Sequence, residues 1–203
     1  MENCKFRAKC KKVGTENCNR ICYPYVFLHG IDGNSGFLAT RNVPNKYSDN
    51  MFDNLPIEAD NPQVYRAVKG YIENIIERVQ GANRGIFFTG TTGTGKTTVA
   101  ITILNEYLLA RCIQHLSGVK KIETNPVLFM KMSEFQNVYN SQFRGGSDMQ
   151  NKASNSYYNM KEQMMKVDLL VIDDIAMRGL PEGFMNEMYE IIDCRATEDM
   201  TTI

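Results

Sequence analysis

From residue 62 onward, hydrophobic residues alternate between the spacing of amphipathic helices and the short unbroken runs of buried strands. The first clear helical period covers residues 62–81, with Asn61-Pro62 as a start signal and Gly81 as a stop signal. Its hydrophobic residues recur at helical spacing, which predicts one buried helix face. The residues of this face are Val64, Val68, Tyr71, Ile72, Ile75, Ile76 and Val79.

Short apolar runs then alternate with further helical patterns. The runs predict strands at residues 86–88, 127–130 and 169–172, and Thr201-Thr202-Ile203 has the character of another strand start. Helices are predicted at residues 96–112, 134–143, 157–165 and 182–195, with Ser133 as a cap for the second and a polar loop at 144–156. Strands separated by helices indicate an α/β fold with a parallel sheet flanked by helices.

The first 62 residues lack this periodicity. Residues 23–62 are rich in Gly, Asn, Pro and Asp, a composition typical of a linker with local turns. We predict three units along the chain: a cysteine-rich segment at residues 1–30, a linker at 31–62 and an α/β domain at 63–203.

Charge separates the first unit from the rest. The 203 residues include 23 Lys and Arg and 23 Asp and Glu, so the formal net charge is zero. Residues 1–22 nevertheless carry a net charge of +4, which leaves −4 for the remainder. This balance excludes a uniformly basic nucleic-acid coat and an acidic disordered chain. Because no apolar stretch reaches membrane-spanning length and the N-terminus lacks a secretory signal, we expect a cytoplasmic protein without a membrane partner.

The strongest motif follows the strand predicted at 86–88. Residues 90–97 match the phosphate-loop pattern G-x-x-x-x-G-K-[ST], and a helix is predicted to begin there. Glycines let backbone N–H groups turn toward a phosphate chain, and the start of a helix adds partial positive charge. Lys96 has the reach to contact the β- and γ-phosphates, and the Thr97 hydroxyl is a natural Mg²⁺ ligand. The predicted nucleotide-binding residues are Gly90, Thr91, Thr92, Gly93, Thr94, Gly95, Lys96, Thr97 and Thr98.

Two carboxylates, Asp173 and Asp174, follow the apolar strand predicted at 169–172. Ligands of parallel sheets bind at the carboxyl ends of the strands, so Asp173 is expected to face the same crevice as Thr97 and to hold Mg²⁺ through water. Asp174 is the candidate for polarising the water that attacks the γ-phosphate. A solvated turn is the alternative interpretation of this pair.

The loop GTTGTGKT, the strand LLVIDD and the segment Met51-Phe52-Asp53-Asn54-Leu55 together resemble AAA+ ATPases of the helicase-loader type (DnaC/DnaI), with IstB transposition helpers as relatives. The resemblance covers about residues 45–203. It implies a P-loop NTPase domain that binds ATP and Mg²⁺, forms oligomers on single-stranded DNA and delivers a replicative helicase. It also implies that Lys96 and Asp174 act in ATP hydrolysis. Family members often have Glu at the latter position.

Residues 1–22 contain Cys4, Cys10, Cys18 and Cys22 in the spacing C-x5-C-x7-C-x3-C. Four thiolates suit a closed structural Zn²⁺ site, and His29 is an alternative ligand for one of them. The spacing lacks a C-x2-C turn, so four free cysteines are the competing interpretation. Because DnaI-type loaders carry a zinc-containing helicase-binding domain, the resemblance implies that residues 1–30 contact the helicase.

The resemblance also places Thr201–Ile203 in a central strand, between the phosphate-loop strand and the Asp173 strand. We therefore expect the chain to lack about the last quarter of the domain, including the helical lid, and to hydrolyse ATP weakly or not at all. Arg178 and Arg195 are candidates for an arginine finger, but neither lies where the family places that residue. An IstB-like transposition ATPase, a small-molecule kinase and a nucleotide-binding module without turnover are the alternatives.

Overall fold

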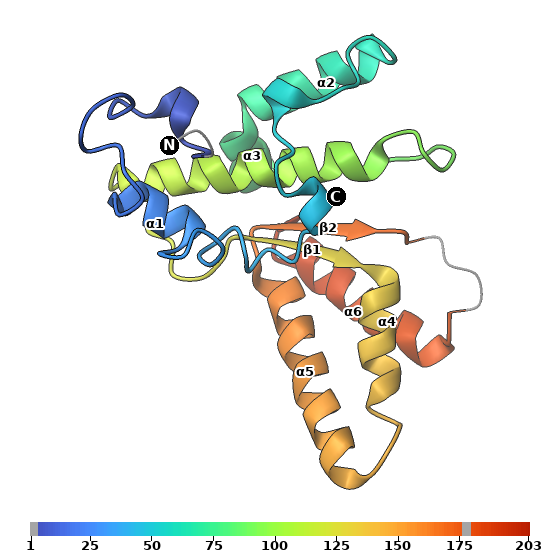
Figure 1. Cartoon of the computed structure of the whole chain (residues 1–203). Coiled ribbons are helices and arrows are strands. Elements are labelled where there is room, and N and C mark those ends of the chain that lie inside the picture. The colour runs from blue at the N-terminus through green and yellow to red at the C-terminus, as the bar shows by residue number, and fades with distance from the viewer. Residues whose placement is uncertain (1–3, 176–179) are drawn as a thin grey trace.

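Two hydrophobic cores lie on opposite faces of a three-stranded parallel sheet (Figure 1). The computed structural model describes residues 4–175 and 180–203. The strands are β1 (Val127–Lys131), β2 (Leu169–Asp173) and β3 (Thr201–Thr202), and they lie in the order β1-β2-β3. The predicted α/β class and parallel sheet are therefore confirmed.

Alternate residues of the strands enter alternate cores, as the pleat of a strand requires. In β2, Leu169 and Val171 enter the first core, whereas Leu170 and Ile172 enter the second. Both faces are covered by helices, which explains why this strand is an unbroken apolar run in the sequence.

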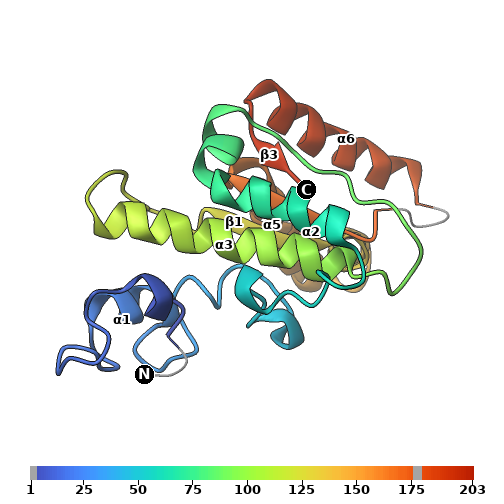
Figure 2. The same ribbon diagram turned by 90° about the horizontal axis from the view of Figure 1, so that it is seen from above.

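The helices divide between the two faces of the sheet (Figures 1 and 2). α2 (Pro62–Glu73) and α3 (Lys96–Leu116) cover one face, and α4 (Met132–Ser141), α5 (Ser147–Lys166) and α6 (Glu182–Thr197) cover the other. α1 (Tyr23–His29) lies near the end of α3, and a π-helical turn (Glu77–Gly81) follows α2. Short 3₁₀ helices are Arg7–Lys9, Asn45–Tyr47 and Phe52–Asn54.

In the part of the chain that the structure describes, no helix has the length and apolar character needed to span a membrane.

Several predicted elements are confirmed. The α2 helix starts at Pro62, where the Asn61 side chain accepts a hydrogen bond from the backbone N–H of Val64 at 3.2 Å. Val68 and Tyr71 of its predicted face are buried, but α2 ends at Glu73, and the stop predicted at Gly81 is instead the end of the π-helical turn. α3, β1, β2, α6 and the strand at Thr201 also lie where the pattern predicts them.

Residues 147–156 of the polar stretch 144–156 are helical, so the predicted loop is wrong except at residues 144–146, which precede the helix. α5 runs without a break from Ser147 to Lys166 and forms a hairpin with α4 that projects away from the sheet (Figure 1). Side chains in its first half are mostly exposed, and a helix without a core contact needs no hydrophobic period. Ser133 is not a cap either, because α4 begins one residue earlier, at Met132.

Residues 86–88 do not form the predicted strand. Ile86 and Phe88 pack against the first core, but Phe87 is 79% exposed and the segment has no ladder partner in the described structure. It does lie beside β3, because a side chain on Gly85 would collide with the carbonyl oxygen of Thr202. Residues 86–88 therefore lie next to β3 as predicted. Within the described residues, however, they form no strand pairing with it.

A buried arginine fixes β3 to the helices behind it. Arg195 of α6 is 1% exposed, and its guanidinium donates hydrogen bonds to the carbonyl oxygens of Met164, Val167 and Thr201 and to the Thr202 hydroxyl. These bonds occupy the guanidinium inside the fold, so Arg195 is not available as an arginine finger. Arg178, the other candidate, lies outside the described residues.

Candidate functional site

The phosphate loop joins the segment beside β3 to the first turn of α3. Gly93 and Gly95 have φ angles of 84° and 82°, in the left-handed region that residues with a side chain rarely adopt. No atom would contact a β-carbon at Gly93, so the backbone conformation alone requires glycine there. The glycine spacing in the sequence thus reflects a curled loop.

Lys96 folds back over this loop. Its ammonium donates hydrogen bonds to the carbonyl oxygens of Gly90 and Thr91, at 2.9 and 2.7 Å. The Thr94 hydroxyl donates to the same Thr91 oxygen at 2.9 Å. A positive charge therefore lies within the curl of the loop, where a phosphate group would need it.

Thr97 and Asp173 meet across the start of α3 and the end of β2. The Thr97 hydroxyl oxygen lies 3.1 Å from each carboxylate oxygen of Asp173 and donates to this carboxylate. A hydroxyl and a carboxylate are the oxygen ligands that Mg²⁺ prefers in phosphate-binding sites. The structure thus brings together two residues separated by 76 positions, and Asp173 faces Thr97 as the sequence predicts.

Asp174 does not join this pair in the structure. Its side chain is exposed, and its backbone has a φ angle of 60°, which is uncommon for a residue other than glycine. Of the remaining predicted nucleotide-binding residues, Thr91 and Thr92 are exposed, and Thr98 lies in the first turn of α3, where its carbonyl accepts a hydrogen bond from the Thr102 hydroxyl.

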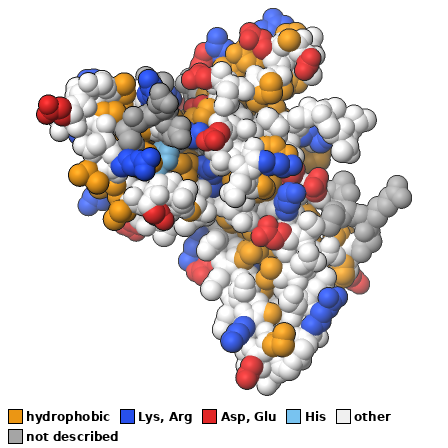
Figure 3. All heavy atoms as spheres, viewed as in Figure 1, with side chains coloured by type: hydrophobic (Ala, Val, Ile, Leu, Met, Phe, Trp, Pro, Cys, Tyr) orange, Lys and Arg blue, Asp and Glu red, His pale blue; other side chains and the backbone are white. Residues whose placement is uncertain are grey.

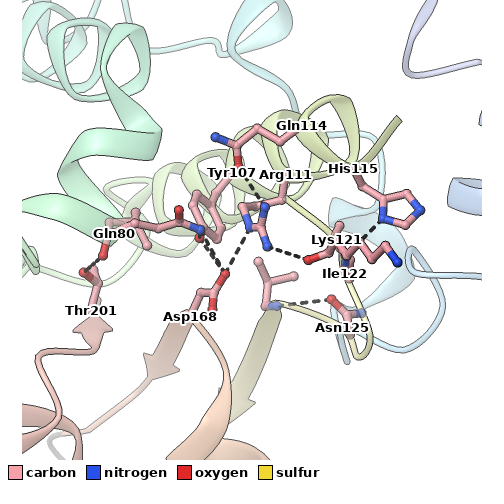
Figure 4. A network of polar contacts seen from close by, with 12 residues as sticks. Gln80, Tyr107, Arg111, Gln114, His115, Lys121, Ile122, Asn125, Asp168 and Thr201 are labelled. Atoms are coloured by element: carbon pink, nitrogen blue, oxygen red, sulfur yellow. Dashed lines mark hydrogen bonds and ion pairs between the residues drawn. The ribbon is translucent and has the colours of Figure 1, made fainter. Parts of the chain in front are cut away.

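A second contact between α3 and β2 lies at the opposite end of the strand (Figure 4). Asp168, which precedes β2, accepts hydrogen bonds from the Tyr107 hydroxyl at 2.8 Å and from Arg111 Nε at 3.1 Å. Gln80 also donates to this carboxylate, at 3.3 Å. Thr97 to Tyr107 is about 15 Å along a helix, and Asp168 to Asp173 is about 16 Å along a strand. The helix α3 and the strand β2 are therefore fixed together at two points, and the distance between these points is nearly the same along the helix as along the strand.

The segment Phe52–Leu55 lies against the same helix. The backbone N–H of Phe52 donates to the carboxylate of Glu106 at 2.9 Å, and the Phe52 ring stacks on Tyr65 with centroids 4.9 Å apart. Two residues beyond this segment, the Ile57 side chain reaches the phosphate loop, because a β-carbon at Gly95 would lie 3.8 Å from Ile57 Cγ2. The motif therefore packs between α2 and α3 beside the loop.

No protein-family model, curated protein or solved structure matches this chain. The candidate site is thus defined by its own geometry, in which Lys96, Thr97 and Asp173 converge at one end of α3.

The four N-terminal cysteines converge near the other end of α3. Cys4, Cys10, Cys18 and Cys22 are free thiols that line one small cavity. The pKa of the Cys4 thiol is raised by burial and, to a smaller extent, by its proximity to the other three. Within residues 4–175 and 180–203, however, no three Cys, His, Asp or Glu side chains are grouped closely enough to hold a metal ion as they stand.

His29 does not share this cavity. Its Nε2 accepts a hydrogen bond from the backbone N–H of Lys5 at 3.3 Å, and its ring stacks on Tyr25. Burial, together with the nearby charges of Lys5 and Arg41, lowers the pKa of His29 to about 4, and Asp49 partly opposes this shift. The imidazole is therefore a neutral anchor for the cysteine-rich segment.

Sequence reasoning missed the residues that connect these regions through α3. Glu106 is 7% exposed; its carboxylate bonds Phe52 and lies 3.9 Å from the ammonium of Lys9. His115 stacks on Phe27 of α1, with centroids 4.5 Å apart. The sequence does contain one signal for these contacts, which is the presence of charged and polar residues inside the apolar run 99–113. Because buried charges in a helix need partners, such residues indicate contacts with other segments.

His29 predicts a pH dependence of stability. Its pKa in the folded protein, about 4, lies below the ordinary 6.5, so the unfolded chain binds the proton more readily. Stability from the neutral imidazole is present above pH 6.5 and is lost as the pH falls toward 4, by about 3 kcal/mol. His29→Gln keeps a neutral acceptor and should flatten the curve of unfolding free energy against pH in this window, measured by urea unfolding. Equal curves for both proteins would contradict the assignment.

Proposed function

We propose that this chain is a P-loop nucleotide-binding protein that takes ATP with Mg²⁺. The observation that carries the proposal is the Thr97–Asp173 contact at the edge of a glycine loop whose lysine lies within the curl. Glycine turns, an ammonium, a hydroxyl and a carboxylate form the donor and acceptor set that a magnesium-bound triphosphate requires.

Each residue of this set has a distinct task. Lys96 would exchange the carbonyl oxygens of Gly90 and Thr91 for phosphate oxygens. Thr97 and Asp173 would hold Mg²⁺, which neutralises phosphate charge when it is bound. Asp174, which is exposed and directly follows Asp173, would orient water for attack on the γ-phosphate.

The finer proposal is an AAA+ helicase loader that couples ATP binding and hydrolysis to delivery of a replicative helicase onto single-stranded DNA. The resemblance of the phosphate loop, the strand end and the segment Phe52–Leu55 supports it, as does the packing of that segment beside the loop. Basic and hydrophobic side chains are both exposed on the α4–α5 hairpin (Figure 3), which suits a DNA strand or a second copy of the chain. The exposed residues there include Arg144, Lys152, Phe143 and Met149.

Binding of ATP by the purified chain tests the nucleotide site. Isothermal titration calorimetry with Mg-ATP should give a 1:1 complex, and Lys96→Ala should weaken binding about 10- to 100-fold because charge-assisted bonds to the phosphates are lost. Lys69→Ala, an exposed residue of α2, is the matched control and should bind like the wild type. Equal affinity for wild type and Lys96→Ala, with both proteins folded by circular dichroism, would refute the site.

Capture of a partner separates the loader from its rivals. We expect the immobilised chain to retain a purified replicative helicase more strongly with ATP than without, and Lys96→Ala to abolish the difference. Retention of a transposase instead would favour the IstB-like alternative. ATP binding without retention of either would favour a nucleotide-binding module without turnover.

We propose in addition that Cys4, Cys10, Cys18 and Cys22 hold a structural Zn²⁺ ion. Their shared cavity supports this proposal, because all four cysteines line the same small space and four thiolates suit a closed structural site. His29 is not needed as a ligand, since it already accepts the Lys5 N–H. The zinc unit would present the basic residues 1–22 to the helicase.

Elemental analysis tests the zinc site. Protein purified without chelator should contain one zinc per chain, and Cys18→Ser should lose it while it retains Mg-ATP binding. Cys194→Ser is the matched control, because this thiol lies on α6, and it should leave the zinc content unchanged. Zinc-free wild-type protein would remove the metal from the proposal.

A further inference from the structure

The helix α6 leaves a stripe of hydrophobic side chains uncovered. Met185, Tyr189 and Ile192 are 55%, 73% and 42% exposed, and their spacing of four and three residues places them on one side of the helix. Phe184 and Ile191 of the same helix are buried in the second core. Met185, Tyr189 and Ile192, the α6 stripe, therefore face away from the core, and a contiguous exposed stripe of this kind is typical of a docking surface.

The α6 stripe has an acidic border. Glu182 lies three residues before Met185, and Asp193 lies four residues after Tyr189, so both are next to the stripe on the helix surface. Both carboxylates are exposed, and neither forms an ion pair within residues 4–175 and 180–203. A partner that matches this surface needs exposed hydrophobic side chains accompanied by positive charge.

The chain itself has such a surface at the C-terminal end of α3. Ile21, Tyr23 and Val119 are 81%, 61% and 72% exposed. The Tyr23 hydroxyl lies 3.3 Å from His115 Nε2, and the N–H of Val119 donates to the Gln114 carbonyl at 2.9 Å. These two contacts hold Tyr23 and Val119 at the same end of the helix, and Ile21 lies two residues before Tyr23.

Basic residues accompany these three hydrophobic side chains. Arg20 precedes Ile21, and Lys120 and Lys121 follow Val119. All three basic side chains are exposed, and in the part of the chain that the structure describes none of them forms an ion pair. They outnumber the exposed carboxylate of Glu123 nearby. We call this surface the basic end; its residues are Ile21, Tyr23, Val119, Arg20, Lys120 and Lys121.

The α6 stripe and the basic end cannot meet within one molecule. The helices α1 and α3 pack on the first core, whereas α6 packs on the second, so the sheet lies between them. Both views of the ribbon show α1 and α6 on opposite sides of the molecule (Figures 1 and 2). The partner of each surface must therefore come from outside the chain.

We propose that the α6 stripe of one molecule docks on the basic end of a second copy of the chain. Hydrophobic side chains would meet hydrophobic side chains, and Glu182 and Asp193 would face the basic residues. Because the two surfaces differ, the contact is head-to-tail, and association continues into chains or rings instead of stopping at a dimer. A contact of few residues is transient and weakens with salt. Neither surface includes a residue of the phosphate loop, so this inference does not rest on the proposed nucleotide site.

One variant of each surface tests the contact by sedimentation velocity. The sedimentation coefficient of the wild-type chain should rise with concentration beyond that of a dimer. Tyr189→Ser in the α6 stripe and Val119→Asp in the basic end should each raise the dissociation constant about 30-fold or more, since an aromatic anchor is lost or a carboxylate opposes the acidic border. Both side chains are exposed, so circular dichroism should show that the fold is kept.

Mixing the two variants gives the decisive result. The Tyr189→Ser chain keeps the basic end and the Val119→Asp chain keeps the α6 stripe, so an equimolar mixture should form a 1:1 dimer and nothing larger. Phe143→Ser, at an exposed position on the α4–α5 hairpin, is the matched control and should associate like the wild type. A monomeric wild-type chain, a mixture without the dimer, or association that is lost only in Phe143→Ser would each overturn the proposal.

Discussion

The carboxylate of Asp168 fixes the helix that begins at the phosphate loop to the strand that ends at Asp173. Tyr107 and Arg111 hold this carboxylate at one end of β2, and Thr97 meets Asp173 at the other. Helix and strand are both stiff, and the two spans agree to within about 1 Å. The position of the Thr97 hydroxyl relative to Asp173 therefore depends on a polar contact at the far end of the sheet, which has no part in the candidate chemistry.

The helix α3 also contacts β1, α2, the segment Phe52–Leu55 and the N-terminal region. Glu106 contacts both Phe52 and Lys9, and His115 stacks against Phe27. Its surface is buried along most of its length, so its position is set by packing on several sides at once. A partner that displaced the cysteine-rich segment would act on the same helix that carries Lys96, which gives the proposed partner and nucleotide sites a physical connection.

The features that the sequence predicted correctly are those with a local signal. The curled glycine loop at residues 90–97, the two long strands and α3 have a period or a motif that depends on their own residues, whereas phosphate binding by the loop stays a prediction. The first half of α5 was missed because its side chains contact no core, and the strand at 86–88 failed because pairing depends on a partner far along the chain. The roles of Glu106, Arg111 and Asp168 depend on contacts between distant segments, which a single sequence does not reveal. The resemblance to helicase loaders likewise remains a prediction.

The two cores differ in chemical character. Beneath α3 the buried side chains are largely branched aliphatic residues, such as Ile101, Ile103 and Leu104, whereas beneath the hairpin they are mostly methionine and aromatic residues, such as Met164, Phe135 and Phe184. Thioethers have several rotatable bonds and adapt to changes in shape, but branched side chains have few alternative rotamers. The packing beneath the hairpin therefore tolerates small displacements of the hairpin, because methionine side chains can change rotamer. The aliphatic core beneath α3 is stiffer and keeps this helix, and with it Lys96, in place.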